Sequence, residues 1–218
     1  DLDLFVGGRV VPTKYPMPAK SAILRNDKGV FTDVTKEVAP ELEKGGLVCG
    51  AIWTDYNADN KLDLMIIGEW MPVTIYKNDG GKFSDATAAA GLSDATGWWN
   101  SIVSGDFDND GDLDILVVNQ KPVKQGYPVE SMTHLYRNDS TSGNWLQVQL
   151  KGNRSDLLGL GATVKVFANS IQMMREVDGG GSSHLSQNSS ILHFGLGDID
   201  QVDSIVVNWI GGTPQKLT

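Results

Sequence analysis

The sequence predicts an all-β protein in which a loop-rich, repeated part precedes a small antiparallel sheet domain. Three observations lead to this prediction. Short apolar runs rich in β-branched residues follow two acidic loops, one turn sequence recurs along the first two thirds of the chain, and the last third alternates apolar with polar residues. The 25 glycines among 218 residues also suit a fold with many turns, and the length allows two domains.

The most informative segment is the loop 106–114, which has aspartate at its positions 1, 3, 5, 7 and 9 and glycine at position 6, where the backbone must turn sharply. Calcium takes six to eight oxygen ligands at about 2.3–2.6 Å, and alternate residues of a tight loop can converge on one ion. Carboxylates this close repel one another unless a cation neutralises them. We therefore expect a Ca²⁺ site here. Its expected ligands are the side chains of Asp106, Asp108, Asp110 and Asp114 and the carbonyl of Asp112.

A weaker copy of this loop spans residues 55–63, with asparagine at positions 3 and 6 and lysine at position 7. Asparagine can supply an oxygen ligand, and it tolerates the left-handed backbone better than other non-glycine residues. Because the loop has fewer carboxylates, we expect it to bind calcium more weakly. Its expected ligands are the side chains of Asp55, Asn57, Asp59 and Asp63 and the carbonyl of Lys61.

Neither loop is an EF-hand, because that motif needs a glutamate at position 12 and a following helix. Position 12 is Val117 in one loop and Ile66 in the other. The apolar runs 115–118 and 64–67 that follow the loops instead predict buried strands. The expected ion therefore stabilises a turn between two strands.

The loops belong to a longer internal repeat. The pair Asn-Asp recurs at Asn26, Asn78 and Asn138, and after the first two a phenylalanine, an aspartate and a threonine follow at matching intervals. The segment 1–6 aligns with 112–117, so we expect Asp3 to be the last ligand of a further loop whose beginning precedes this chain.

These units resemble FG-GAP/VCBS repeats, the calcium-loop blades of integrin-α-like β-propellers. The resemblance covers residues 1–143 and implies a partial β-propeller with blades at about 1–48, 49–97 and 98–143. It also implies the same two sets of metal ligands. The loop 55–63 departs from the family pattern at Asn57, Asn60 and Lys61, which weakens the expected calcium site there.

Residues 144–218 change character. Leu146, Val148 and Leu150, and then Val164 and Val166, alternate with polar residues, as on a sheet with one solvated face. This pattern predicts a small antiparallel β-sandwich or barrel. The stretch resembles the ASPIC/UnbV domain that follows such propellers in acidic secreted proteins. The matching segments are residues 144–146, 159–164, 175–180, 193–197 and 202–209, although Ile210 stands where the family usually has proline.

Composition narrows the class of partner. A net charge of −9 disfavours nucleic acid and anionic membranes as partners. The single Cys49 excludes an internal disulfide framework, and we expect it to be a small buried apolar residue. No apolar run approaches 18 residues, so no membrane-inserted helix is expected. With the resemblance, this composition predicts an extracellular, cell-surface or periplasmic location.

No catalytic motif is visible. The sequence lacks Gly-x-Ser-x-Gly, His-Glu-x-x-His and phosphate-loop patterns, and none of His134, His184 and His193 accompanies an obvious nucleophile. Ser183 next to His184 is the nearest suggestion, but adjacent residues of a strand or loop point apart. We therefore expect a non-enzymatic, secreted, calcium-binding scaffold for cell adhesion or for binding an extracellular protein or glycan.

Two alternatives stay open. The chain could be the carbohydrate-binding part of a polysaccharide-processing protein, or a fragment of an enzyme whose catalytic residues lie outside it. The first alternative depends on the tryptophans near the loops, Trp53, Trp70, Trp98 and Trp99, which either stack on sugars or pack between blades. Exposure of Trp98 and Trp99 would favour the sugar platform.

The number of repeats leads to a last expectation. A propeller closes with about four to eight blades, and this sequence holds two complete calcium loops and the end of a third. We therefore expect an open arc of blades whose uncovered strand edges pair with the C-terminal domain or cause self-association.

Overall fold

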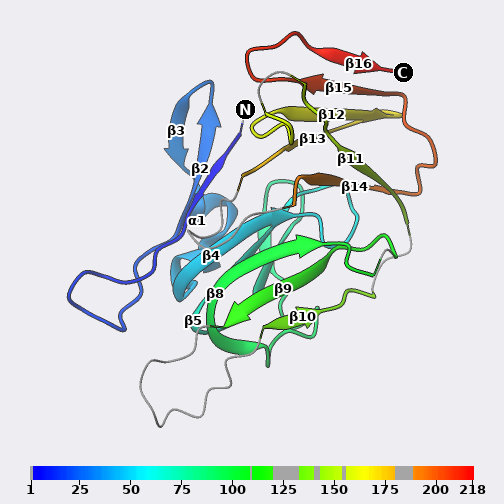
Figure 1. The fold of residues 1–218 in the computed structure, drawn as a ribbon. Coiled ribbons are helices and arrows are strands. Elements are labelled where there is room, and N and C mark those ends of the chain that lie inside the picture. The colour runs from blue at the N-terminus through cyan, green and yellow to red at the C-terminus, as the bar shows by residue number, and fades with distance from the viewer. Residues whose placement is uncertain (1, 109, 120–132, 140–142, 154–155, 180–188) are drawn as a thin grey trace.

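The structure is a computed structural model that describes residues 2–218 except for 109, 120–132, 140–142, 154–155 and 180–188 (Figure 1). Almost all regular structure in the described residues is β-strand. The helical segments are one turn of α-helix, α1 (Thr35–Val38), and a 3₁₀ helix, η1 (Pro40–Lys44). No helix in the described part of the chain is long and apolar enough to cross a membrane.

The first repeat forms a three-stranded antiparallel sheet in the order β1-β2-β3. Its strands are β1 (Leu4–Val6), β2 (Ala22–Asp27) and β3 (Val30–Asp33). The helical turns α1 and η1 follow β3 and lead into the next repeat, beside this sheet in Figure 1.

The second and third repeats are two antiparallel meanders, β4 to β7 and β8 to β10. Their strands are β4 (Leu47–Thr54), β5 (Asp63–Pro72), β6 (Thr74–Asn78), β7 (Phe83–Asp85), β8 (Thr96–Gly105), β9 (Asp114–Asn119) and β10 (His134–Tyr136). Strands β5 and β8 also pair, at an irregularity in the ladder near Trp70, so the two meanders share one seven-stranded sheet.

The C-terminal part consists of two antiparallel sheets, β11-β14 and β13-β12-β15-β16, drawn yellow to red at the top of Figure 1. Its strands are β11 (Asn144–Gln149), β12 (Thr163–Ala168), β13 (Ile171–Glu176), β14 (Ile191–Gly197), β15 (Ser204–Asn208) and β16 (Gln215–Leu217).

Strand β5 explains how the repeats hold together. Its residues Leu64 and Ile66 pack into a core shared with the first repeat, whereas Met65 and Ile67 pack into a core shared with the third. All four side chains are fully buried. Because successive residues of a strand point to opposite faces, a continuous apolar run is what a sheet covered on both sides requires.

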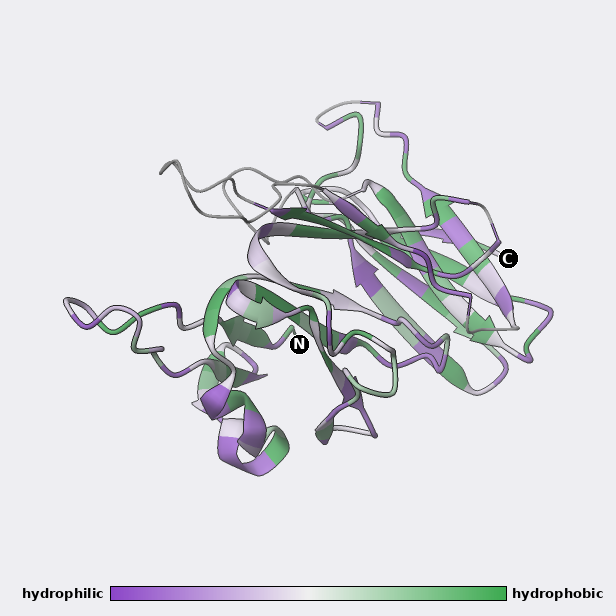
Figure 2. Ribbon diagram, turned by 90° about the horizontal axis from the view of Figure 1, so that it is seen from below, coloured by the Kyte–Doolittle hydropathy of each residue, from purple (hydrophilic) through white to green (hydrophobic). Residues whose placement is uncertain are grey.

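Among the described residues, the C-terminal part has a core of its own, built from residues after 145. The structure places in this core the alternating residues of the sequence pattern, among them Leu146, Val148, Val164, Val166 and Ile205. Bands of green and purple alternate along these strands in Figure 2, as expected for sheets with one buried and one polar face.

The predicted all-β class is therefore confirmed as several antiparallel sheets with almost no helix. No closed propeller or barrel occurs among the described residues. The blade limits and the partial-propeller arrangement stay predictions, and the pairing of β5 with β8 was not anticipated because nothing local in the sequence marks it.

Candidate metal centre

The last aspartate of each loop joins the loop to the following hairpin. Asp63 Oδ1 accepts a hydrogen bond from the Asn78 backbone N–H at 2.7 Å, and its Oδ2 accepts one from the Tyr56 N–H at 3.3 Å. The third repeat has the same pair of bonds, from Asn138 at 2.8 Å and Phe107 at 2.9 Å to Asp114.

The asparagine of each hairpin completes this connection. The side-chain amides of Asn26 and Asn78 donate to the Leu2 and Leu62 carbonyls, each at 3.0 Å. Asp3 accepts from the Asn26 N–H at 2.9 Å. The internal repeat inferred from sequence is thus also a repeat of hydrogen bonds, and Asp3 has the position in it that the alignment predicted.

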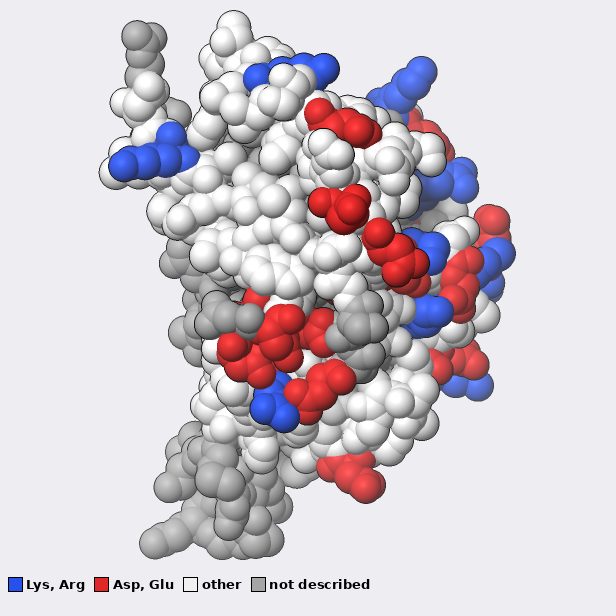
Figure 3. Space-filling model, turned by 90° about the vertical axis from the view of Figure 1, so that its right-hand side faces the viewer, with Lys and Arg blue, Asp and Glu red and all other residues white. Residues whose placement is uncertain are grey.

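The loop 106–114 gathers its carboxylates. One oxygen from each of Asp106, Asp108 and Asp114 lies within 4.8 Å of the others, and the same holds for Asp108, Asp110 and Asp139. Figure 3, which faces the side where β8 turns into β9, shows acidic side chains gathered in one patch. Asp139 was missing from the predicted ligands, although it follows the hairpin asparagine and could have been suspected on that basis.

The loop backbone holds these side chains in place. The N–H of Asp110 donates to Asp108 at 3.3 Å, and the N–H of Asp112 donates to Asp110 at 3.0 Å. Gly111 has φ of +98°, which glycine adopts without strain. Desolvation by the surrounding loop raises the pKa of the exposed Asp108, and the neighbouring Asp110 carboxylate raises it further, so a nearby cation would stabilise the ionised form.

The residues of this loop fit a hard divalent cation. All potential ligands are oxygens, which suits calcium rather than a soft metal. Asp106 Oδ1 is buried and has no hydrogen-bond partner among the described residues, whereas its Oδ2 accepts from Gln147 Nε2 at 3.3 Å. A buried carboxylate oxygen without a partner is costly, and a metal ion would satisfy it.

The loop 55–63 has a different balance of contacts. The described residues Asp55, Asp59 and Asp63 do not bring three carboxylates together as the other loop does. Asp55 accepts from the N–H groups of Asp59 and Asn60, each at 3.0 Å, and Asp59 pairs with the Lys61 ammonium at 3.0 Å. Calcium at this loop, with Asn57 as a further ligand, stays a prediction.

Burial perturbs two carboxyls of this loop. Asp55 is 5% and Asp63 0% exposed. Burial is the main cause that raises the pKa of Asp55 to about 6 and that of Asp63 to about 7. Asn60 adopts φ of +69°, so the expectation that asparagine replaces glycine in the left-handed backbone is confirmed.

Both loops lie against the C-terminal domain. The outward residues of β11 face the loop 106–114, since Gly111 lies directly beneath the Trp145 indole and Gln147 binds Asp106. Gly195 of β14 lies so close to the other loop that an added Cβ would be 2.9 Å from Ala58 Cα. The inward residues of both strands meanwhile fill the C-terminal core.

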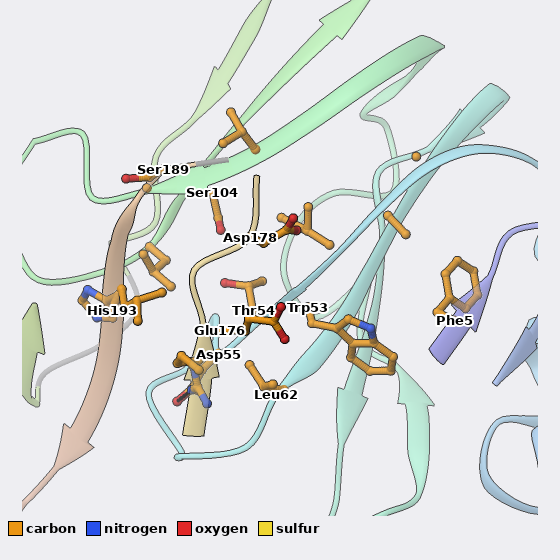
Figure 4. A pocket seen from close by; sticks show the side chains of 18 of the residues that line it. Phe5, Trp53, Thr54, Asp55, Leu62, Ser104, Glu176, Asp178, Ser189 and His193 are labelled. Carbon is orange, nitrogen blue, oxygen red and sulfur yellow. Dashed lines mark ion pairs between the residues drawn. The ribbon is translucent and has the colours of Figure 1, made fainter. Parts of the chain in front are cut away.

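A cavity of about 1220 Å³ is lined by residues of β1, β4 and the end of β8 and by the C-terminal strands β13 and β14. Figure 4 shows Thr54 and Asp55 on one side of it and His193 on another. Thr54 Oγ1 and His193 Nδ1 are buried without a hydrogen-bond partner in the described part of the chain. Burial lowers the pKa of His193, which favours a neutral imidazole.

The tryptophans that the sequence analysis singled out differ in their exposure. Trp99 is 2% exposed and packs in the core, whereas Trp70 is 48% exposed and lies 5.1 Å, centroid to centroid, from the half-buried Trp98. Cys49 is half-buried. The pair Ser183 and His184 lies outside the described residues.

Comparison with known proteins finds two family models that match the two parts of the chain. A family model described as FG-GAP-like repeat matches residues 55–117, and one described as ASPIC and UnbV matches residues 152–218. Cartilage acidic protein 1 of Mus musculus is 31% identical over 107 residues, which are 49% of this chain and 16% of that protein. The Homo sapiens protein of the same name is 30% identical over 107 residues, 15% of its length.

The chain thus spans about one sixth of the length of the curated relatives it matches. The resemblance predicted from the loop and turn sequences is confirmed for both parts. This chain contains an FG-GAP-like repeat followed by an ASPIC/UnbV domain, with a distant similarity to cartilage acidic protein 1.

Proposed function

We propose that this protein is a calcium-stabilised, non-enzymatic scaffold that acts outside the cytoplasm, at a cell surface, in the extracellular space or in a periplasm. The observation that carries the calcium assignment is the convergence of Asp106, Asp108 and Asp114, with a buried Asp106 oxygen that has no partner among the described residues.

The metal would be held by the side chains of Asp106, Asp108, Asp110 and Asp114 and by the Asp112 carbonyl. When bound, the ion neutralises carboxylates that otherwise repel one another. The chain's own residues connect this centre to its surroundings. Asp114 accepts from Asn138 of the following hairpin, and Asp106 accepts from Gln147 of the C-terminal domain. Metal binding would therefore stabilise the loop, the hairpin and the domain contact together.

A scaffold role for adhesion or ligand binding is supported by the double-sided packing of β5, because a sheet buried on both faces is rigid and presents its loops in fixed positions. The relatives carry the word acidic in their name, and this chain has a net charge of −9. An acidic surface favours a protein or glycan partner over nucleic acid or membrane.

Thermal unfolding with and without calcium tests the proposal. At free calcium about a hundred times the Kd, a single site that binds only the folded state adds about 2.7 kcal/mol. We expect EDTA to lower Tm, calcium to restore it, and Mg²⁺ not to restore it. Asp108→Ala and Asp110→Ala should remove the calcium effect, whereas Asp94→Ala, an exposed aspartate outside the loops, should leave it intact.

Isothermal titration calorimetry provides the decisive result. Absence of calcium uptake by the folded wild-type chain would rule the proposal out, as would uptake that Asp108→Ala and Asp110→Ala leave unchanged.

A second candidate, carbohydrate binding, is favoured by one observation. Trp70 and Tyr15 are 48% and 57% exposed, and the Trp70 indole N–H donates to the Tyr15 hydroxyl at 3.1 Å, which holds the two rings beside Trp98. Exposed aromatic rings of this kind can stack on sugar rings. A glycan array probed with calcium and with chelator tests it. Binding that Trp70→Ala abolishes would support this candidate, and an array without binding would exclude it for the glycans present.

A further inference from the structure

An arginine of the C-terminal domain points toward the loop 55–63. Arg175 lies on β13 between Met173 and Val177, which both belong to the C-terminal core, and strand alternation directs all three to the same face. Its guanidinium carbon lies 5.4 Å from the centre of the Phe194 ring, and its side chain is 14% exposed. A charged residue at an inward position of a strand requires a partner.

That partner is Asp55, the first residue of the loop. Arg175 Nη2 lies 3.9 Å from Asp55 Oδ2, an ion pair without a direct hydrogen bond among the described residues, and the Asp55 side chain is 2% exposed. Burial lowers the pKa of Arg175 and raises that of Asp55, as expected for charges removed from water, while each charge opposes the shift of the other. Such a pair costs more to break than an exposed one, because one buried charge remains uncompensated.

The approach of the two parts is fixed by Gly195. A Cβ at this position would lie 2.9 Å from Ala58 Cα and 3.1 Å from Asp55 Oδ2. Only glycine allows β14 to lie this close to the loop, and this proximity brings the guanidinium within reach of the carboxylate.

The two loops therefore receive different groups from the same domain. At the equivalent first position of the other loop, Asp106 receives the neutral amide of Gln147 and keeps one oxygen without a partner among the described residues. Asp55 receives a cation, and Lys61 supplies a second cation to Asp59. Arg137 also lies near the other loop, 3.9 Å from Asp108, but its side chain is 62% exposed and its nearer partner is Asp139 at 2.7 Å. What distinguishes the loop 55–63 is therefore the buried guanidinium beside Asp55, together with the Lys61 ammonium beside Asp59.

We propose, against the calcium site that the sequence predicts at the loop 55–63, that Arg175 is the built-in counter-cation of this loop. The loop therefore binds no calcium in the folded chain and joins the FG-GAP-like repeat to the ASPIC/UnbV domain through an ion pair. The ligand residues of this loop do not fit a second metal while Arg175 is present. The inference rests on the proposed function, in which the loop 106–114 is the calcium site.

Native mass spectrometry of the intact chain in calcium counts the ions bound. We expect one ion in the wild type, none in Asp108→Ala and one in Asp55→Asn. Arg175→Met keeps the apolar stem and removes the charge, so we expect it to bind two ions, and the double variant Arg175→Met/Asp55→Asn to bind one. Arg25→Met, which removes an exposed arginine paired with Asp27, should bind one ion like the wild type.

The outcomes separate the two proposals. Two ions in the wild type, of which Asp55→Asn removes one, would overturn the role of Arg175 and leave calcium binding at 106–114 intact. No ion in the wild type would instead contradict the proposed function. If Arg175→Met does not fold, a loss of calcium in Asp55→Asn would still overturn the proposal, because it is incompatible with an Arg175-neutralised loop. A folded Arg175→Met that binds only one ion would overturn the role of Arg175 as well.

Discussion

Gly111 has two structural roles, one in the turn of the loop 106–114 and one in the contact of this loop with the C-terminal domain. Gly111 turns the loop with φ of +98°, and it leaves room for the indole of Trp145, which stacks on His193 at 5.8 Å. The sequence explains the first role, because position 6 of such a loop needs a sharp turn. The second role depends on a side chain 34 positions later in the sequence and appears only in the fold.

A comparison of Gly111→Ala with the matched substitution Gly80→Ala separates these two roles. Gly80 has φ of +81° with no atom within 4 Å of an added Cβ, so Gly80→Ala should cost only the backbone strain, about 1 kcal/mol. Gly111→Ala adds a clash with Trp145, and overpacking typically costs about 1–3 kcal/mol more. Urea unfolding in EDTA, which removes the metal contribution, measures both. Equal losses would show that Trp145 does not limit this position.

Cys49 gives a second prediction at the residue scale. Burial is the main cause that raises the pKa of its thiol above the ordinary value, and the Glu69 carboxylate raises it further. A raised pKa means less thiolate at any pH below it, and only the thiolate reacts. We expect the native protein at pH 8 to react with Ellman's reagent more slowly than glutathione does, and the urea-unfolded protein to react much faster. Cys49 is half-buried rather than fully buried as the sequence predicted, and rapid reaction of the native thiol would contradict the protection that this partial burial provides.

At the scale of the element, the repeat is a hairpin fastened to a loop by one asparagine and one aspartate. The third copy has an additional contact, since the Asn138 amide donates to the Leu113 carbonyl at 3.4 Å and to the Tyr56 carbonyl of the preceding loop at 2.8 Å. The sequence predicted the hairpin turn at Asn138, but the bond to Tyr56 crosses between repeats and follows from their packing.

Because of this contact, we expect an asparagine-to-alanine substitution to lower the stability more in the third repeat than in the first. Asn138→Ala leaves the Tyr56 and Leu113 carbonyls without this donor, which typically costs about 1–3 kcal/mol. Asn26→Ala removes the corresponding bond from an exposed end of the first repeat and should cost less. Chemical denaturation of the two variants gives the comparison. A larger loss for Asn26→Ala would refute a special role of the third hairpin.

At the scale of the whole molecule, the described residues of the repeats form two cores on opposite faces of β5, and those of the C-terminal domain form a third. Within the described residues, strand β1 pairs only with β2, so its other edge carries free backbone groups. Leu4 and Val6, on one face of this strand, are 47% and 45% exposed. An apolar edge of this kind favours pairing with another chain.

Self-association through β1 is therefore expected for the isolated chain. Leu4→Lys places a charge at the edge and should lower the apparent mass in light scattering, whereas Leu157→Lys, at a 72% exposed residue outside the strands, should not. A wild-type chain that is monomeric at high concentration would disprove this prediction.

Local patterns account for much of this structure. The runs 64–67 and 115–118 are strands as predicted, because β-branched and apolar residues bounded by turn residues have few alternatives. The prediction of burial is confirmed for 64–67 but is wrong for part of 115–118, where Ile115 and Val117 are buried and Val118 on the other face is 39% exposed. The loop 106–114 gathers its carboxylates because they lie within nine residues of one another in the sequence. The sequence did not anticipate Asp139 at this loop or Arg175 at the other, since both come from separate strands or hairpins that only packing brings near.

The sequence by itself determined the all-β class, the repeated loops and hairpins, and the alternation that gives the C-terminal domain its core, because each depends on neighbouring residues and on strand periodicity. Tertiary structure decided which partner each loop receives. The neutral Gln147 lies on β11 and the charged Arg175 on β13, and the packing of the C-terminal domain against the repeats brings them to two similar loops. The electrostatic environment of a buried carboxylate depends on every charge near it in space, and local sequence does not contain that information.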